Sequence, residues 1–571
     1  MKNKCIIFRL RLLMLVSMLV LETRSSFFQV SGFELRVSIP ASTTTNHTDM
    51  ASSNIFTRAN PNDVVVAMKQ SIVYLETSFY GYEQSQPWRH KNLSENWAVA
   101  CAVGEYEVLT TAWNVANLAF VKALRYGQNE FISAKIKVID YECNLCLIEL
   151  DPNELSGPLK PLIFSEDYQK GAEVDFYWLS SDNHLYNGRG FLDHATVQKT
   201  NTSYENHLRY IVANTSHHTG AGQVYCVGSE PIGIASWANE NKEAGLIPAE
   251  TINRFLAAVA DNKSGFIEDE AGLSLSKLVS KLEAGSPSLE FPGRASTTLN
   301  VRPINYEGFG SVGFATSELL DPAMRSFLKM PTTLKNGAYV TDVYNLGTGC
   351  NVLKKADVIL AIDANPLNSY GQFMHPKYER LNFNYLITSK TVGETVLFEL
   401  WRNGRKIHLG AEVKSFKASE MLVPYHEYDQ QPEYIITGGF ILQKLTREYL
   451  KRWGDDWTGK VSPHLYHYYR DFAFKPTSER NNIVILSYVL PADINLGYSD
   501  LRQIVVKKFN GMTIRTIADI LTAQKLNPES NYDVIEFELD NPVIVIPREQ
   551  LPAADMFISK RYGIHKLLNI N

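Results

Sequence analysis

Between residues 62 and 258 the chain is a series of short apolar segments separated by turn residues, and this pattern restricts the fold most strongly. Examples are SIVYLETSFYG, WAVACAVG, EVDFYWLS and PIGIASW. Many short, regularly spaced segments of this kind predict an all-β barrel or sandwich. The stretch PAETINRFLAAVA then places Ile252, Phe255, Leu256 and Val259 on one side, which predicts an amphipathic closing helix.

With 571 residues the chain is too long for a single core, so three or four domains are expected. Lys and Arg residues precede the apolar run LLMLVSMLVL, which predicts a secretory signal peptide or a retained N-terminal membrane anchor. The boundaries that we predict are a signal or anchor at 1–26, a polar and disordered linker at 27–61, a β domain at 62–260, a linker at 261–300 containing a helix in EAGLSLSKLVSKLEAG, and two modules at 301–417 and 418–571.

The two C-terminal modules share a pattern. DVILAIDANPL and QIVVKKFNGMTI both predict a strand, a turn and a second strand, which suggests related units. Asn403-Gly404 and Asn510-Gly511 are typical hairpin turns. In DPAMRSFLK, Asp321 is expected to cap a helix whose first turn holds Pro322.

Charge and motifs exclude several classes of ligand. The formal net charge is −5 and there is no basic run, so no nucleic-acid partner is expected. His217 and His218 are adjacent and lack the spacing of two metal ligands on one helix face, so we expect no metal and no cofactor. Cys143 and Cys146 lie in a segment that alternates like a strand, which favours buried, inert thiols over a redox pair.

One segment raises the question of catalysis. Residues 212–236, VANTSHHTGAGQVYCVGSEPIGIAS, combine a polar approach, a glycine turn and an apolar strand ending in Ile-Gly-Ile, as in a segment that carries a nucleophilic serine. Gly220 stands where that serine is expected.

The order of the segments resembles the HtrA/Deg (Do-like) serine proteases, closest to the plant-type Deg subgroup and its bacterial relatives. The resemblance covers residues 62–571 and rests on VLTTAWNVAN, IDYECNLCLIEL, NTSHHTGAGQV, PIGIASW and LVPYHEYDQQPEYIITGGFILQKLTREYL. It implies a mainly β fold, in which a trypsin-like double six-stranded β-barrel is followed by two PDZ-like α+β modules. It also implies a trimer-based homo-oligomer.

The resemblance assigns the base position to Trp113, the carboxylate position to Asn144 and the nucleophile position to Gly220. Below, these are the triad positions. Acyl transfer needs a nucleophile, a base within hydrogen-bond reach and a group that orients the base. Indole only donates a hydrogen bond, the Asn amide is neutral, and glycine has no side chain. Thr219 and His218 are near Gly220 in sequence, but adjacent side chains on a tight loop diverge, so no catalytic residue is expected.

Two further sites follow from the resemblance. Trp113 is expected to fill the cleft between the barrels as a packed seam, with an aromatic binding platform as the alternative. The loop Ser311, Val312, Gly313 and Phe314 is expected to bind the C-terminal carboxylate of a peptide through its backbone amides. The alternative is that the chain's own segments cover this groove. Ala356 replaces a family glycine, and we expect a reshaped turn there because alanine disfavours positive φ.

The sequence therefore predicts an exported protein, periplasmic or secreted, that binds peptide C-termini or unfolded polypeptides without hydrolysing them, in a chaperone-like or regulatory role. Two alternatives remain open. One is an active serine-type endopeptidase that uses displaced residues, and the other is a structural protein that serves oligomer assembly.

Overall fold

The computed structural model describes residues 61–200, 202–217, 219–264, 307–454 and 456–570. The expected signal or anchor, the polar linker as far as residue 60, and the expected helix near residues 270–285 lie outside the described residues. No helix in the described ranges is both long and apolar enough to cross a bilayer.

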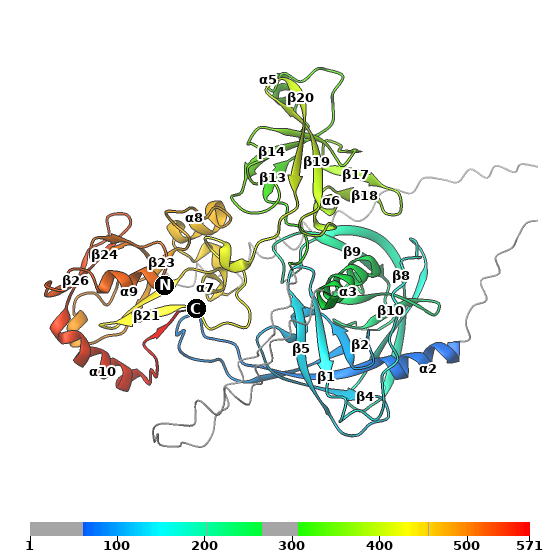
Figure 1. Ribbon diagram of the computed structural model, residues 1–571, viewed down its shortest axis with the longest axis horizontal. Coiled ribbons are helices and arrows are strands. Elements are labelled where there is room, and N and C mark those ends of the chain that lie inside the picture. Colours follow the sequence, from blue (N-terminus) through cyan, green and yellow to red (C-terminus); the bar gives the residue numbers. More distant parts are fainter. Residues whose placement is uncertain (1–60, 201, 218, 265–306, 455, 571) are drawn as a thin grey trace, which may run out of the picture. The chain divides into compact units, whose positions relative to one another are not determined.

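The N-terminal part forms two closed six-stranded barrels, which confirms the expected trypsin-like double barrel (Figure 1). The first barrel has the strand order β1-β2-β3-β6-β5-β4 and the second β10-β11-β12-β9-β8-β7. Closure leaves few unpaired strand edges. The strands are β1 (Ile72–Phe79), β2 (Ser94–Ala102), β3 (Glu107–Thr110), β4 (Leu118–Arg125), β5 (Ile132–Asp140), β6 (Leu145–Leu150), β7 (Glu173–Leu179), β8 (Leu185–Gln198), β9 (His207–Ala213), β10 (Val224–Val227), β11 (Glu230–Ala238) and β12 (Ala244–Pro248).

A helix that the strand pattern did not predict precedes the first barrel. α2 spans Pro61–Ser71 and runs directly into β1. It buries Val64 and Met68, which are spaced so that they share one helix face. Ser71, the third buried residue at this spacing, is polar, so the sequence shows only two apolar positions of the helical period before the apolar run of β1 begins.

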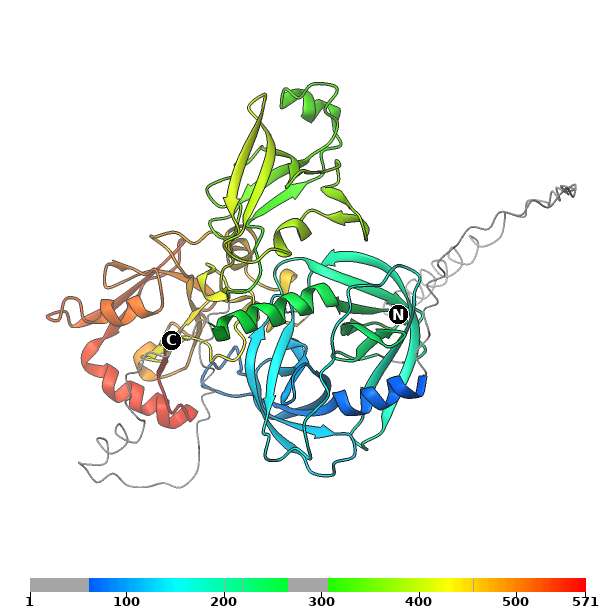
Figure 2. The same cartoon turned by 45° about the vertical axis from the view of Figure 1, so that its right-hand side comes forward.

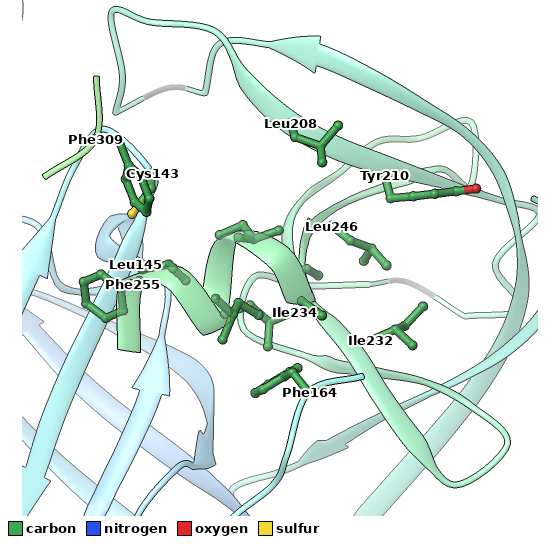
Figure 3. Close-up of a cluster of buried hydrophobic side chains, with 14 of the residues drawn as sticks. Cys143, Leu145, Phe164, Leu208, Tyr210, Ile232, Ile234, Leu246, Phe255 and Phe309 are labelled. Atoms are coloured by element: carbon green, nitrogen blue, oxygen red, sulfur yellow. The ribbon is translucent and has the colours of Figure 1, made fainter. Parts of the chain in front are cut away.

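α3 (Ala249–Ser264) follows β12, as expected from the sequence, and packs against β11 and β12 (Figure 2). Ile252, Phe255 and Val259 are buried on its inner face, and Leu256 packs partly buried against the same cluster. Figure 3 shows this cluster, in which Phe255 lies beside Leu145 and Ile234 comes from β11.

The middle module forms a sheet of order β13-β14-β15-β19-β20, with β16 paired to β15. Asp321 caps α5, accepting hydrogen bonds from the backbone amides of Ala323 and Met324, and Asn403-Gly404 turns the β19–β20 hairpin; both were expected. The elements are β13 (Phe314–Ser317), α5 (Pro322–Phe327), β14 (Ala338–Val343), β15 (Val358–Ile362), β16 (Asn365–Pro366), β17 (Gln372–His375), β18 (Glu379–Asn382), α6 (Tyr385–Thr388), β19 (Thr395–Arg402) and β20 (Arg405–Glu412).

The turn before β15 differs from the expectation that alanine would reshape it. Ala356 adopts a φ of 74°, the left-handed conformation that glycine supplies in the family pattern. The buried Asp357 carboxylate fixes the turn: it accepts from the Lys354 backbone amide at 2.7 Å and pairs with Arg402, also at 2.7 Å. These contacts hold Ala356 in a conformation that is unfavourable for a residue with a Cβ.

The C-terminal domain is built on a sheet of order β27-β26-β24-β23-β22-β21-β28, with β25 paired to β24 through the expected Asn510-Gly511 turn. β24–β25 and β15–β16 are both a strand paired with a two-residue strand, as the repeat suggested. Its elements are η2 (Ala418–Glu420), β21 (Tyr434–Thr437), β22 (Phe440–Lys444), α7 (Arg447–Lys451), η3 (Trp457–Gly459), α8 (Pro463–Phe472), β23 (Val484–Val489), η4 (Asp493–Asn495), β24 (Ile504–Phe509), β25 (Met512–Thr513), α9 (Ala518–Gln524), β26 (Tyr532–Phe537), β27 (Ile544–Pro547), η5 (Arg548–Gln550), α10 (Leu551–Tyr562) and β28 (Leu568–Asn569).

Candidate functional site

Two of the three triad positions are joined by a hydrogen bond. Trp113 lies in the short 3-10 helix η1 (Ala112–Val115), and Asn144 lies in the turn before β6 with a φ of 63°. The Trp113 backbone amide donates to Asn144 Oδ1 at 2.9 Å, and Asn144 Nδ2 donates to Ser236 Oγ of β11 at 3.0 Å. The buried Asn144 side chain therefore connects the first barrel to the second.

The loop that carries Gly220 is tied to the same region. Asn114 Nδ2, one residue after Trp113, donates to the carbonyl oxygen of Ala221 at 3.2 Å. The Gly222 amide donates to the Ala235 carbonyl at 2.8 Å, and Gly222 has a φ of 89°. A Cβ at Gly222 would lie 2.0 Å from the carbonyl oxygen of Val99, so the loop lies directly against β2.

The side chains at these positions offer little chemistry. Asn144 has both its oxygen and its nitrogen engaged in structural hydrogen bonds. Gly220 supplies no side chain, although a Cβ there would have its nearest neighbours at 3.7 Å (Gln223 Nε2) and 4.0 Å (Trp97 Cη2). The surroundings of position 220 therefore leave room for a Cβ. The hydroxyl is absent because the residue is glycine, not because neighbouring atoms exclude a side chain.

Trp113 does not fill a packed seam, so that prediction is wrong. Its side chain is 48% exposed. It lines a cavity of about 740 Å³, to which the strand ends of the first barrel and residues of the C-terminal domain also contribute, among them Tyr428, Arg447 and Trp457. Because the facing residues belong to the C-terminal domain, no local pattern in the sequence places the indole beside this open space.

Sequence reasoning missed one hydroxyl–imidazole contact near the triad positions. Ser216 Oγ lies 2.9 Å from Nδ1 of His217, and the same oxygen accepts from the Arg189 backbone amide at 2.7 Å. Both side chains are exposed. The only sign of this contact in the sequence is that a serine directly precedes two histidines, in the run SHH at residues 216–218. Thr219 is half-buried in the same loop, and His218 lies outside the described residues.

The expected carboxylate-binding loop of the middle module is already engaged by the chain itself. Ser311, Val312, Gly313 and Phe314 are all buried. The Val312 amide donates to the carboxylate oxygen Oε1 of Glu205 at 2.9 Å, and the Ser311 amide donates to the Lys414 carbonyl at 2.8 Å. Two of the amides that would receive a peptide carboxylate, those of Ser311 and Val312, therefore already have acceptors within the chain. The assignment of this loop to peptide binding stays a prediction.

Glu205, the partner of the Val312 amide, is a residue that the sequence analysis did not single out. It lies between β8 and β9 of the second barrel and is 9% exposed. Burial raises its pKa from the ordinary 4.5 to about 7, while the Val312 hydrogen bond and the charge of Lys199 act in the opposite direction. The hydrogen bond between Val312 and Glu205 joins residues 107 apart in sequence, and no local pattern marks it.

The cysteines behave as buried thiols, as expected for Cys143 and Cys146. Both are buried and unpaired, and burial raises the pKa of each well above its usual range. Of these two residues, Cys146 lies on β6, whereas Cys143 precedes the strand, which begins at Leu145. In the described part of the chain, no cluster of His, Cys, Asp and Glu is arranged to hold a metal ion.

Comparison with known proteins gives matches in three ways. A family model described as PDZ domain matches residues 423–568. Protease Do-like 2, chloroplastic, of Arabidopsis thaliana is 26% identical, with 84% of this chain and 72% of the relative covered. Protease Do-like 4, mitochondrial, from the same plant is 23% identical, with 78% and 75% covered. Among solved structures, an HtrA-type protease AlgW with decapeptide aligns with a TM-score of 0.40 and 17% identity, covering 62% of this chain and 98% of that chain.

Proposed function

The chain is a homologue of the Do-like (HtrA-type) proteases with a C-terminal PDZ domain, and from this premise we propose that it binds polypeptides without cleaving them. The observation that carries the proposal is the set of residues at the triad positions. Trp113, Asn144 and Gly220 offer no nucleophile and no proton acceptor of the kind that acyl transfer needs.

The hydrogen bonds around these positions support the same reading. Asn144 connects η1 and β11, and Asn114 holds the Gly220 loop, so the three triad positions lie on segments that hydrogen bonds tie together. A peptidase cleft with these residues retains surface that can hold a chain but has no group to attack it.

An exposed strand edge beside this cleft supports a polypeptide as the ligand. β2 pairs with β3 only at Cys101 and Ala102, so Ser94–Trp97 pair with β1 on one side only. These four residues are exposed, and Trp97 reaches the Gly220 loop. An extended peptide can add to such an edge through main-chain hydrogen bonds, whatever its sequence.

A second candidate function, residual hydrolysis by displaced residues, is favoured by the Ser216–His217 contact of 2.9 Å. Among the described residues no carboxylate contacts His217, and the Ser216 oxygen also accepts from Arg189. A serine is activated efficiently only when its base is itself oriented by a third group, so we rank this candidate second.

The N-terminal basic and apolar segment supports delivery out of the compartment of synthesis, and relatives named chloroplastic and mitochondrial favour an organelle as the destination over export from the cell. Trimer-based assembly and a chaperone-like role remain part of the proposal. Localisation of a fluorescent fusion, and N-terminal sequencing of the mature protein, test the proposed delivery to an organelle.

The proposed function predicts binding without turnover. Fluorescein-labelled, unfolded casein should raise its anisotropy on titration with the protein, and a serine-reactive fluorophosphonate should leave the protein unlabelled. Labelling that is lost in Ser216→Ala or Thr219→Ala would favour the protease. A large particle in sedimentation that binds neither casein nor any peptide would favour the purely structural alternative.

A further inference from the structure

We propose that the cavity beside Trp113 selects acidic polypeptide segments that also carry an aromatic side chain. This inference rests on the proposed function, because it names the class of chain that the cleft holds. The cavity measures about 740 Å³. This volume is typical of pockets that bind small ligands or side chains of a peptide. Below it is called the Trp113 cavity.

The two sides of the Trp113 cavity are fastened to each other. The Asn117 amide donates to Asp429 Oδ1 at 2.7 Å, and the Asp429 amide donates to Asn117 Oδ1 at 3.0 Å. The Tyr141 hydroxyl also donates to Asp429, and the Tyr141 and Tyr428 rings stack with centroids 4.2 Å apart. These contacts join the first barrel to the C-terminal domain beside the cavity, which residues following β8 also line.

Its lining carries an excess of positive charge. Lys199, Arg447 and Lys451 line it, against the single carboxylate of Glu448. Glu448 is already faced by Lys451 at 3.6 Å and Arg447 at 4.0 Å. Burial lowers the pKa of His426, while Glu448, whose Oε1 lies 3.5 Å from His426 Nδ1, acts in the opposite direction.

One of these cations is open to a further anion. Lys199 is exposed and forms no ion pair with a described residue, although its charge acts on the pKa of the buried Glu205. Arg447 donates through Nη2 to His426 Nε2 at 2.7 Å, but its Nε is buried and has no acceptor among the described residues. Because that atom is buried, a carboxylate entering the cavity would meet the exposed Lys199 ammonium and not the Arg447 Nε.

The same lining is aromatic. Trp113 is half exposed at the cavity, and Phe79, Tyr428, Trp457 and Tyr469 contribute further ring surface. Trp457 and Tyr469 meet edge to face with centroids 5.1 Å apart. Rings beside cations suit a ligand that presents an aromatic or apolar side chain next to a carboxylate.

Rings and cations would also suit a single-stranded nucleic acid. The charge of the whole chain argues against it, since a net charge of −5 disfavours the approach of an extended polyanion. A short acidic segment needs only the local charges of the cavity. Position favours a polypeptide too, because Asn96 of the exposed β2 edge lines the same cavity.

The test uses the full chain and two fluorescein-labelled peptides of one sequence containing Trp, the first with Asp and Glu residues and the second with Asn and Gln in their place. We expect the acidic peptide to bind about tenfold more tightly at low salt, and this advantage to shrink at high salt. Trp113→Ala and Lys199→Gln should each weaken its binding about three- to tenfold. Lys355→Gln, an exposed lysine outside the cavity, should leave binding unchanged.

The inference is overturned if the two peptides bind equally, if neither cavity variant has an effect, or if an oligonucleotide of equal charge binds more tightly than the acidic peptide. Lys199→Gln alters an exposed side chain that forms no ion pair with a described residue, so it tests the site even if Trp113→Ala fails to fold. Failure of the proposed function looks different: unfolded casein and both peptides would all fail to bind. Casein binding that is sensitive to Trp97→Ala but not to Lys199→Gln would retain the function and reject the cavity.

Discussion

Gly222→Ala should destabilise the protein by about 3–5 kcal/mol, whereas Gly220→Ala should cost less than about 1 kcal/mol. The two glycines are two residues apart in one loop but meet different surroundings. At Gly222 the φ of 89° is unfavourable for any side chain, and a Cβ would lie 2.0 Å from the Val99 carbonyl oxygen. That atom is backbone within a closed barrel, so it cannot move aside without displacing β2.

At Gly220 the nearest atoms to an added Cβ are 3.7 Å and 4.0 Å away, which is ordinary van der Waals contact. Chemical denaturation of the two single variants measures the difference in the free energy of unfolding. Equal destabilisation by both would mean that the loop does not lie against β2 as described. The result also bears on catalysis, because a tolerated side chain at position 220 shows that the absence of a serine there is not a steric requirement.

Glu205→Ala should open the loop of the middle module to added peptides, tightening the binding of a free peptide C-terminus by about tenfold or more. In the wild-type protein the Val312 amide is satisfied by Glu205 at 2.9 Å, so a peptide carboxylate must displace it. Glu205→Gln is the matched control, since its amide oxygen can still accept from Val312. A peptide amidated at its C-terminus should gain nothing from Glu205→Ala. Unchanged peptide binding in Glu205→Ala would show that this loop is not a carboxylate site.

The same residue predicts a pH dependence of stability. The pKa of Glu205 is raised from 4.5 in the unfolded chain to about 7 in the folded protein, so the folded state holds this proton more tightly. Its stabilising contribution is complete below about pH 4.5 and is lost as the pH rises through about 7. The loss amounts to about 3 kcal/mol, from about 1.36 kcal/mol per pKa unit.

His207 acts in the opposite direction, because burial lowers its pKa to about 3 and its contribution is lost as the pH falls from about 6.5 to that value. The measurement is therefore the difference in unfolding free energy between the wild-type protein and Glu205→Gln, in which the His207 contribution cancels. The wild-type protein should lose stability relative to Glu205→Gln between about pH 4.5 and about pH 7. A flat difference across this range would contradict the burial of an ionisable Glu205.

The sequence correctly predicted those elements whose conformation is determined by neighbouring residues. Asn403-Gly404 gives a hairpin because both residues adopt positive φ, at 51° and 77°, as a two-residue turn of this kind requires. Asp321 caps α5 through its own side chain. The barrels followed from strand spacing, and the contact between Trp113 and Asn144 followed from the order of segments shared with Do-like proteases. In each of these cases the conformation depends on residues that are close in sequence, or the prediction follows from the order of segments along the chain.

The remaining features depend on partners that are distant in sequence. Glu205 meets Val312, and Trp113 and Tyr428 come to line one cavity, only after separate domains have packed together, so neither arrangement leaves a periodic signal in the sequence. The left-handed Ala356 is similar, because Arg402 and the buried Asp357 determine a conformation that the residue type alone argues against. The triad positions and the carboxylate-binding loop therefore stay predictions, whereas the residues that surround them became known only from the structure.

The most direct test of binding without cleavage is the mass spectrum of unfolded casein recovered from its complex with the full-length protein after prolonged incubation at neutral pH. We predict that the recovered casein has its intact mass, because no side chain at Trp113, Asn144 or Gly220 can attack a peptide bond. Casein fragments whose formation stops in Ser216→Ala or Thr219→Ala would contradict this and identify the protein as a protease.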